Sequence, residues 1–210
     1  MKLYNANLSP NAWRVRAVAS ELGIDLEIVD VDLRNGGQKT PEFLAMNPNG
    51  KVPVLADGDF VLWESRAIDT YLASQKPERG LYSDDPRTRA VIDQWVYWQA
   101  AHLGTTVQKI VFEKFMKGLF GMGEADPSVV AAETKALEQL LAILEGALKG
   151  KDWIAGPLTI ADFTLASTFI YRKPAGISLD AYPNISRWLA AMEARESWKT
   201  ASAPILKMLG

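Results

Sequence analysis

Over residues 1–75, the spacing of apolar side chains alternates between the two-residue period of strands and the longer period of helices. A strand is predicted at 2–6, a helix at 11–22 that stops at Gly23, and a second strand from Ile24 to Ile28. Because a parallel strand pair needs a crossover of this length, the pattern predicts a βαβ unit with a right-handed connection.

The same pattern continues into a hairpin and a further helix. Val52–Ala56 and Phe60–Trp63 flank Asp57-Gly58-Asp59, a turn sequence typical of antiparallel hairpins. A helix follows at Ser65–Ser74. The first 75 residues therefore have the signature of a small α/β domain.

Beyond a polar segment at 76–86, the hydrophobic pattern is helical throughout. Asp126 precedes Pro127 as a helix N-cap, and leucines at helical spacing follow as far as Leu148. Thr159 and Asp162 form a capping box that opens a helix over 163–171, and another helix contains Trp188. The predicted organisation is an α/β domain at 1–75, a linker at 76–86 and an all-helical domain at 87–210.

The charge balance removes several classes of function. The 210 residues carry 23 Lys and Arg against 25 Asp and Glu, a net charge of −2, which offers no basic excess for nucleic acid. No uncharged stretch reaches the roughly 18 apolar residues of a membrane span, and the first residues are too polar for a signal peptide. We therefore expect a cytoplasmic protein without nucleic-acid or membrane partners.

The scarcity of reactive side chains is equally restrictive. The chain has no cysteine and a single histidine, His102, which excludes disulfides, cysteine nucleophiles and thiolate or clustered-histidine metal sites. No nucleotide-binding glycine motif and no serine-hydrolase elbow is present. His102 continues the row Val91, Trp95 and Trp98, which favours core packing over a role in a binding pocket. We expect no metal cofactor.

Three motifs in the α/β part could bind a ligand or take part in a reaction. Ser9 opens the first helix, and Glu64-Ser65 opens the helix at 65–74, so two helix N-termini with free N–H groups are available to anions. Lys51-Val52-Pro53 places a proline at the start of a strand, which marks either a sheet edge or a ligand site. A serine cap alone explains each serine, but together these features suit a small ligand with several anionic groups.

The motifs resemble the cytosolic glutathione transferase superfamily, in its serine-type members that are bacterial phi-, theta- or zeta-like. The resemblance covers the whole chain and rests on the order and spacing of these stretches: 9–16 (SPNAWRVR), 36–39 (GGQK), 43–44 (FL), 47–55 (NPNGKVPVL), 64–68 (ESRAI), 158–163 (LTIADF) and 182–188 (YPNISRW). It implies a thioredoxin-like N-terminal domain that binds glutathione, an all-α C-terminal domain that supplies most of the electrophile pocket, and a homodimer. Glutathione would be the co-substrate, added to small hydrophobic electrophiles.

The resemblance also implies roles for individual residues. Ser9 donates its hydroxyl to the glutathione sulfur, with Asn11 as a second candidate. Val52 pairs its backbone with the cysteinyl unit before a cis Pro53, next to Lys51. The γ-glutamyl end falls to Glu64 and Ser65, and the glycine carboxylate to Gln38 and Lys39, where the family often has histidine at the position of Gln38.

Members of this superfamily also have other functions. Glutathione-dependent dehalogenation, isomerisation or peroxide reduction would use the same site, and some members are non-catalytic binding domains. The branch that isomerises maleylacetoacetate has a cysteine where Asn11 stands, which disfavours that activity here. The segment 118–123 (GLFGMG) is either a lid or a loop between helices.

Overall fold

The structure is a computed structural model that describes residues 1–209, and these form two compact units. The first contains Met1–Tyr82 together with residues 194–209, and the second contains Ser83–Glu193. The helical region at the chain's end thus belongs to the first unit, whereas the sequence places all of 87–210 in one helical domain.

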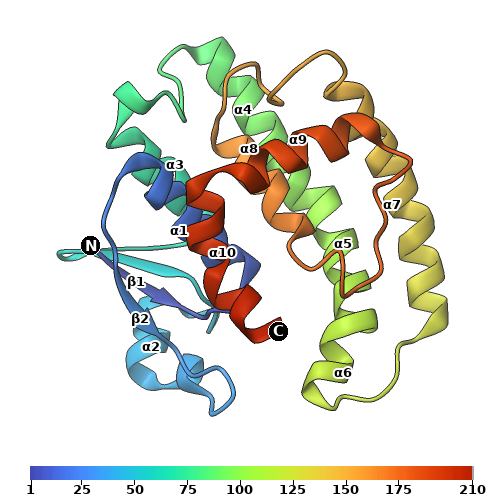
Figure 1. The fold of residues 1–210 in the computed structure, drawn as a ribbon. Coiled ribbons are helices and arrows are strands. Elements are labelled where there is room, and N and C mark those ends of the chain that lie inside the picture. The colour runs from blue at the N-terminus through green and yellow to red at the C-terminus, as the bar shows by residue number, and fades with distance from the viewer. Residues whose placement is uncertain (210) are drawn as a thin grey trace. The chain divides into compact units, whose positions relative to one another are not determined.

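The first unit is an α/β domain built on a four-stranded sheet of order β2-β1-β3-β4 (Figure 1). Its elements are β1 (Lys2–Asn5), α1 (Pro10–Leu22), β2 (Glu27–Asp30), α2 (Pro41–Met46), β3 (Val54–Asp57), β4 (Phe60–Trp63), α3 (Ser65–Ser74) and α10 (Glu196–Leu209). β1 is parallel to β2 and antiparallel to β3, and β3 is antiparallel to β4. The predicted βαβ unit, hairpin and thioredoxin-like architecture are confirmed.

The second strand starts later than the apolar pattern indicates. Gly23 caps α1 with φ of 68°, and the Ile24 N–H donates to the Ala19 carbonyl oxygen at 2.9 Å. Ile24 therefore still belongs to the helix cap, and pairing with β1 begins only where Glu27 meets Lys2. β2 is an edge strand, and Ile28 is 44% exposed instead of buried.

α10 packs along α1, as the red and blue helices of Figure 1 show. The ring centroids of Trp13 and Trp198 are 4.6 Å apart, and the two ring planes are inclined by 68°. Trp13 Nε1 donates a hydrogen bond to Ser202 Oγ at 2.9 Å. Arg195 and Ser197 both donate to the Glu21 carboxylate. These contacts explain why the C-terminal segment joins the first unit.

The second unit is entirely helical, as predicted. It contains α4 (Pro86–Trp98), α5 (Gly104–Val111), α6 (Lys117–Phe120), α7 (Pro127–Ala147), α8 (Ile160–Ala166) and α9 (Pro183–Ala194) apart from its last residue. Two π-helical turns, 99–103 and 112–116, join α4, α5 and α6. α7 runs beside α5, and α8 beside α4 (Figure 1).

The capping box at Thr159 and Asp162 is confirmed, and the Asp162 carboxylate also accepts from Ile154 N and Trp188 Nε1. α8 is shorter than predicted because a 3₁₀ turn, 167–169, replaces its expected continuation. The Ser167 hydroxyl donates to the Thr164 carbonyl at 2.8 Å, a local bond that competes with the helical pattern.

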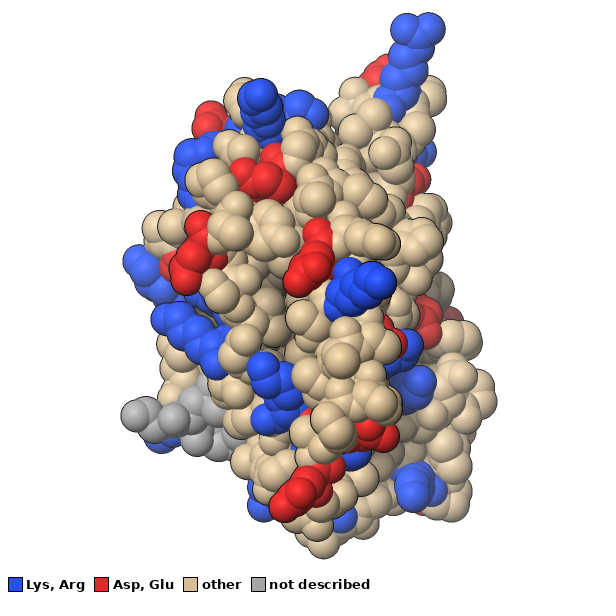
Figure 2. All heavy atoms as spheres, turned by 90° about the vertical axis from the view of Figure 1, so that its right-hand side faces the viewer, with Lys and Arg blue, Asp and Glu red and all other residues tan. Residues whose placement is uncertain are grey.

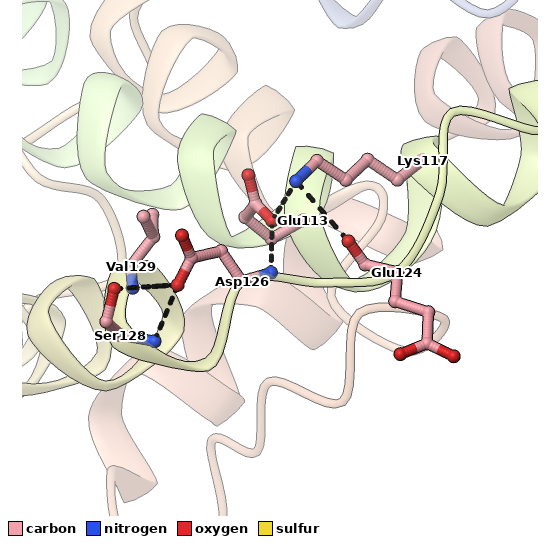
Figure 3. A network of polar contacts seen from close by, with 6 residues as sticks. All are labelled: Glu113, Lys117, Glu124, Asp126, Ser128 and Val129. Atoms are coloured by element: carbon pink, nitrogen blue, oxygen red, sulfur yellow. Dashed lines mark hydrogen bonds and ion pairs between the residues drawn. The ribbon is translucent and has the colours of Figure 1, made fainter.

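The connection from α6 to α7 is held by a polar network around Glu113 (Figure 3). Glu113 Oε2 accepts from Lys117 Nζ at 2.6 Å and from the Asp126 N–H at 2.7 Å. Asp126 in turn caps α7 by accepting from Ser128 N at 2.8 Å. The segment 118–123 lies between these anchors, with Phe120 and Met122 exposed; its role as a lid stays a prediction.

Candidate functional site

The register of the sheet brings three of the predicted motifs to one end of it. Tyr4 pairs with Val54, and Val54 pairs with Trp63, so the end of β1, the start of β3 and the end of β4 are adjacent. The chain continues from these points to Ser9, back to Val52-Pro53, and on to Glu64-Ser65. Residues far apart in sequence thus meet at a single sheet end.

Ser9 is the N-cap of α1. Its Oγ accepts from the Ala12 N–H at 3.3 Å, so the plain capping interpretation is correct. The bond uses only the oxygen, and no acceptor for the hydroxyl hydrogen occurs in residues 1–209. The cap therefore leaves a donor at the helix N-terminus, where a negative charge is favoured.

Glu64 and Ser65 form the second helix start. Glu64 has φ of 73° and ψ of 107°, the only non-glycine residue with positive φ among those described. Such backbone strain is concentrated at ligand sites. Ser65 is the buried first residue of α3, and its Oγ accepts from Arg14 Nη1 at 3.3 Å.

The third motif is held by Asn47, whose role the sequence did not reveal. Asn47 is buried, and its Nδ2 donates to the Lys51 carbonyl at 2.6 Å while its Oδ1 accepts from the Asn49 N–H at 3.0 Å. Val52 follows, half-buried and outside the paired part of β3, and its bond to Pro53 is cis. The backbone of Val52 is therefore free of sheet pairing.

Gln38 and Lys39 lie in a 3₁₀ turn, 37–39, that contacts the same loop. Gly50 has φ of 60°, and a Cβ at that position would lie 3.1 Å from the Gln38 carbonyl oxygen. The positive φ favours glycine at this position, and a side chain would also crowd the Gln38 carbonyl. Lys39 and Lys51 are exposed cations on these two adjoining segments. Within residues 1–209, no hydrogen bond or ion pair joins either lysine to Ser9 or Ser65.

Beneath the serines lies a buried pair of charged residues that the sequence analysis missed. Arg14 is 1% exposed and Asp69 is fully buried. Burial lowers the pKa of Arg14 to about 9, aided by the charge of Arg66. Burial also raises the pKa of Asp69 to about 8, against the charges of Arg14 and Arg66. Asn11 is exposed, and its Oδ1 accepts from Arg14 Nη2 at 3.0 Å.

Helical spacing was the signal for both. Arg14 stands four residues before Val18, and Asp69 stands three before Leu72, so each shares a face with a buried residue. The site chemistry that results is a set of hydroxyl, amide and backbone donors next to two helix N-termini, which suits a ligand with several acceptor groups.

The expected burial of His102 in the core was wrong. Its side chain is exposed rather than packed in the core, with the Trp98 ring 6.5 Å away. A π-helical turn, 99–103, shifts the helical periodicity beyond Trp98, so His102 no longer continues the row of Trp95 and Trp98. Val91, which precedes the turn, is also exposed.

Lys, Arg, Asp and Glu are interspersed on the face shown in Figure 2. Within residues 1–209 no three His, Asp or Glu side chains gather as a metal site would require, and whether a metal takes part stays a prediction. None of the helices described has the length and apolarity of a membrane span.

Family models and related proteins all indicate the same family. Residues 1–74 match the glutathione S-transferase N-terminal domain, and residues 101–196 match the glutathione S-transferase C-terminal domain. Glutathione S-transferase 3 from Zea mays is 36% identical over 98% of this chain and 94% of its own length. Glutathione S-transferase D7 from Drosophila melanogaster is 35% identical over 90% of this chain and 82% of its own.

Solved structures agree. Glutathione S-transferase I from maize, in complex with an atrazine glutathione conjugate, superposes with a TM-score of 0.89. It is 32% identical and covers 98% of this chain and 97% of its own. These relatives are plant and insect proteins, so the expected likeness to bacterial members is not what the comparisons bring out. With both domain matches in place, the chain belongs to the glutathione S-transferase family.

Proposed function

We propose that this chain conjugates the glutathione thiolate to small hydrophobic electrophiles, using the sheet end formed by Ser9, Val52-Pro53 and Glu64-Ser65. The observation that carries the proposal is the convergence of these motifs through the pairs Tyr4–Val54 and Val54–Trp63. The maize relative bound to an atrazine glutathione conjugate supports the same reaction class.

Ser9 activates the thiol by hydrogen bonding to its anion. A thiol with a pKa near 8.5 is only about 3% thiolate at pH 7, and lowering that pKa by about two units makes roughly three quarters of it thiolate. The corresponding free energy is about 2.7 kcal/mol, within reach of a hydroxyl donor plus a helix N-terminus. A serine hydroxyl is too weak a base to remove the proton, so Ser9 donates.

The remaining assignments follow the chemistry of the tripeptide. The backbone of Val52 pairs with the cysteinyl unit in the manner of an added strand. The Glu64 carboxylate faces the γ-glutamyl ammonium, and the Ser65 hydroxyl faces its carboxylate. Lys39 and Lys51, with Gln38, surround the glycine carboxylate; each of these contacts is a proposal for this chain.

The wider assignments are also proposals. Residues 1–75 act as the glutathione-binding domain, and the region from 87 to 193 acts as the helical domain, joined by 76–86. α10 packs on α1 and so belongs with the first of these. The chain acts as a serine-type transferase, and its likeness to plant relatives and to insect relatives that include a delta-class enzyme supports this assignment. It works in the cytoplasm as a homodimer, without a metal.

The deciding experiment compares Ser9→Ala with the control Ser9→Thr, which keeps a hydroxyl. Conjugation is measured over aryl halides, isothiocyanates, epoxides and hydroperoxides. We expect Ser9→Ala to lower kcat/KM by about 10- to 100-fold, the effect of losing one donor to a charge, while glutathione affinity changes only a few-fold. Ser9→Thr should retain most activity.

Other outcomes point elsewhere. If Ser9→Ala is fully active and Asn11→Ala is not, the sulfur ligand is Asn11. Glutathione binding without turnover of any electrophile would favour a non-catalytic binding domain, and absence of binding would contradict the proposal.

A further inference from the structure

Arg14 connects the two ends of the candidate site from beneath. It lies on α1 with only 1% of its surface exposed. Its Nη2 donates to Asn11 Oδ1 at 3.0 Å, and its Nη1 donates to Ser65 Oγ at 3.3 Å. One side chain thus contacts a candidate sulfur ligand on α1 and the first residue of α3.

The chemistry of arginine fixes the direction of both bonds. The pKa of Arg14 is lowered to about 9 by burial and by Arg66, while Asp69 and Glu64 act in the opposite sense. The side chain is therefore a cation at neutral pH, with five N–H donors and no acceptor. Any atom that contacts it must accept, so the Asn11 oxygen faces Arg14 and the Asn11 NH₂ group faces away.

The direction of the bond to Ser65 is fixed in the same way. Its oxygen accepts from Arg14, which leaves its hydrogen to donate elsewhere. Neither the Asn11 amide hydrogens nor the Ser65 hydroxyl hydrogen has an acceptor in the part of the chain that the structure describes. Ser9 matches this pattern, since the Ala12 N–H occupies its oxygen at 3.3 Å.

We propose that Arg14 is a positioning residue for glutathione: it occupies the acceptor atoms of Asn11 and Ser65, so that their hydrogens are presented to the ligand. This inference rests on the proposed function. The glutathione thiolate and the γ-glutamyl carboxylate are both acceptors, and a site for them needs donors at both ends. The guanidinium of Arg14 orients a donor toward the ligand at both the sulfur end and the γ-glutamyl end.

The test separates the two ends by two readouts. The pKa of bound glutathione's thiol, from ultraviolet titration, reports the sulfur end; the Kd of S-methylglutathione, which has no thiol, reports the γ-glutamyl end. Arg14→Lys keeps the charge but lacks the planar fork that reaches both acceptors. We expect it to raise the thiol pKa by about one unit and the Kd by about tenfold, in line with lost charge-assisted hydrogen bonds.

Single-site variants dissect the result. Asn11→Ala should move mainly the thiol pKa, and Ser65→Ala mainly the Kd. Adding Arg14→Lys to Asn11→Ala should change the thiol pKa little further, because coupled residues are not additive. Asp162→Asn, which perturbs the capping box of α8, is the stability control and should move neither readout.

The outcomes distinguish this inference from the function on which it rests. Unchanged readouts in Arg14→Lys, or effects that add fully with those of Asn11→Ala, overturn the inference alone. A wild-type protein that fails to bind S-methylglutathione overturns both. If Arg14→Lys does not fold, the wild-type side-chain amide signals of Asn11 in ¹⁵N–¹H spectra decide: they should shift as the bound thiol titrates, and constant signals overturn the inference.

Discussion

Asp69 gives the first unit a pH-dependent stability. Neither of its carboxylate oxygens has a hydrogen-bond partner within residues 1–209, and burial raises its pKa to about 8 against the charges of Arg14 and Arg66. The unfolded chain releases this proton near pH 3.9, so between pH 4 and 8 the folded state holds more protons. The free energy of unfolding therefore falls as the pH rises through that window.

Asp69→Asn should remove this dependence. The variant's advantage over the wild type is expected to be larger at pH 8 than at pH 5 by about 1–3 kcal/mol, because only the wild type has a proton to lose. Urea unfolding at the two pH values measures it, with exposed Asp25→Asn as the control. A difference that is constant with pH, or that grows toward acid, would contradict the assignment.

Glu64 combines a strained backbone with a proposed role in glutathione binding. At φ of 73° a side chain is disfavoured, so Glu64→Gly should be more stable to urea than Glu64→Ala by about 1 kcal/mol. Both variants lose the carboxylate, and calorimetry should show weakened glutathione binding in both. Equal stability of the two would mean that the backbone at residue 64 relaxes without strain.

Sequence reasoning identified the candidate ligand-binding residues but not the buried residues that contact them. Ser9, Ser65 and Val52 stand in stretches with the family's spacing. Ser9 caps α1 as expected, whereas Ser65 is the first residue of α3 and not its cap. Arg14 and Asp69 escaped because charged residues are almost never buried unless paired, although their spacing to Val18 and Leu72 indicated a buried face. The burial of Asn47 was not predicted because its loop has no periodic hydrophobic pattern.

At the scale of elements, α10 is attached to α1 through a few specific bonds. Ser202→Ala removes the hydroxyl that accepts a hydrogen bond from the buried Trp13 Nε1, which should cost about 1–3 kcal/mol of unfolding free energy. Ser74→Ala, an exposed serine on α3, is the control and should change stability by less than about 0.5 kcal/mol. Faster hydrogen exchange confined to α10 would confirm where the loss acts; equal stability of the two variants would refute this attachment.

Several element boundaries were predicted well. α3 begins at Ser65 and ends at Ser74 as expected, and α7 begins after the Asp126 cap. The errors lie where backbone hydrogen bonds override the apolar pattern. The cap at Gly23 delays β2, the Ser167 bond shortens α8, and the turn at 99–103 turns His102 outward.

At the scale of the whole chain, all residues assigned to glutathione lie in the first unit, which also includes α10. The order of motifs revealed the α/β and helical parts, since each has its own hydrophobic period. The return of residues 194–209 to the first unit depends on contacts such as Trp13–Trp198, and distant pairings leave no periodic trace in a single sequence.

The central claim is that this chain lowers the pKa of glutathione's thiol when it binds. Ultraviolet titration of glutathione bound to the wild-type protein measures that pKa directly. We predict a value near 6.5, about two units below the ordinary thiol pKa of about 8.5, and a return toward 8.5 in Ser9→Ala. A bound thiol that titrates at about 8.5 in the wild-type protein would contradict the account.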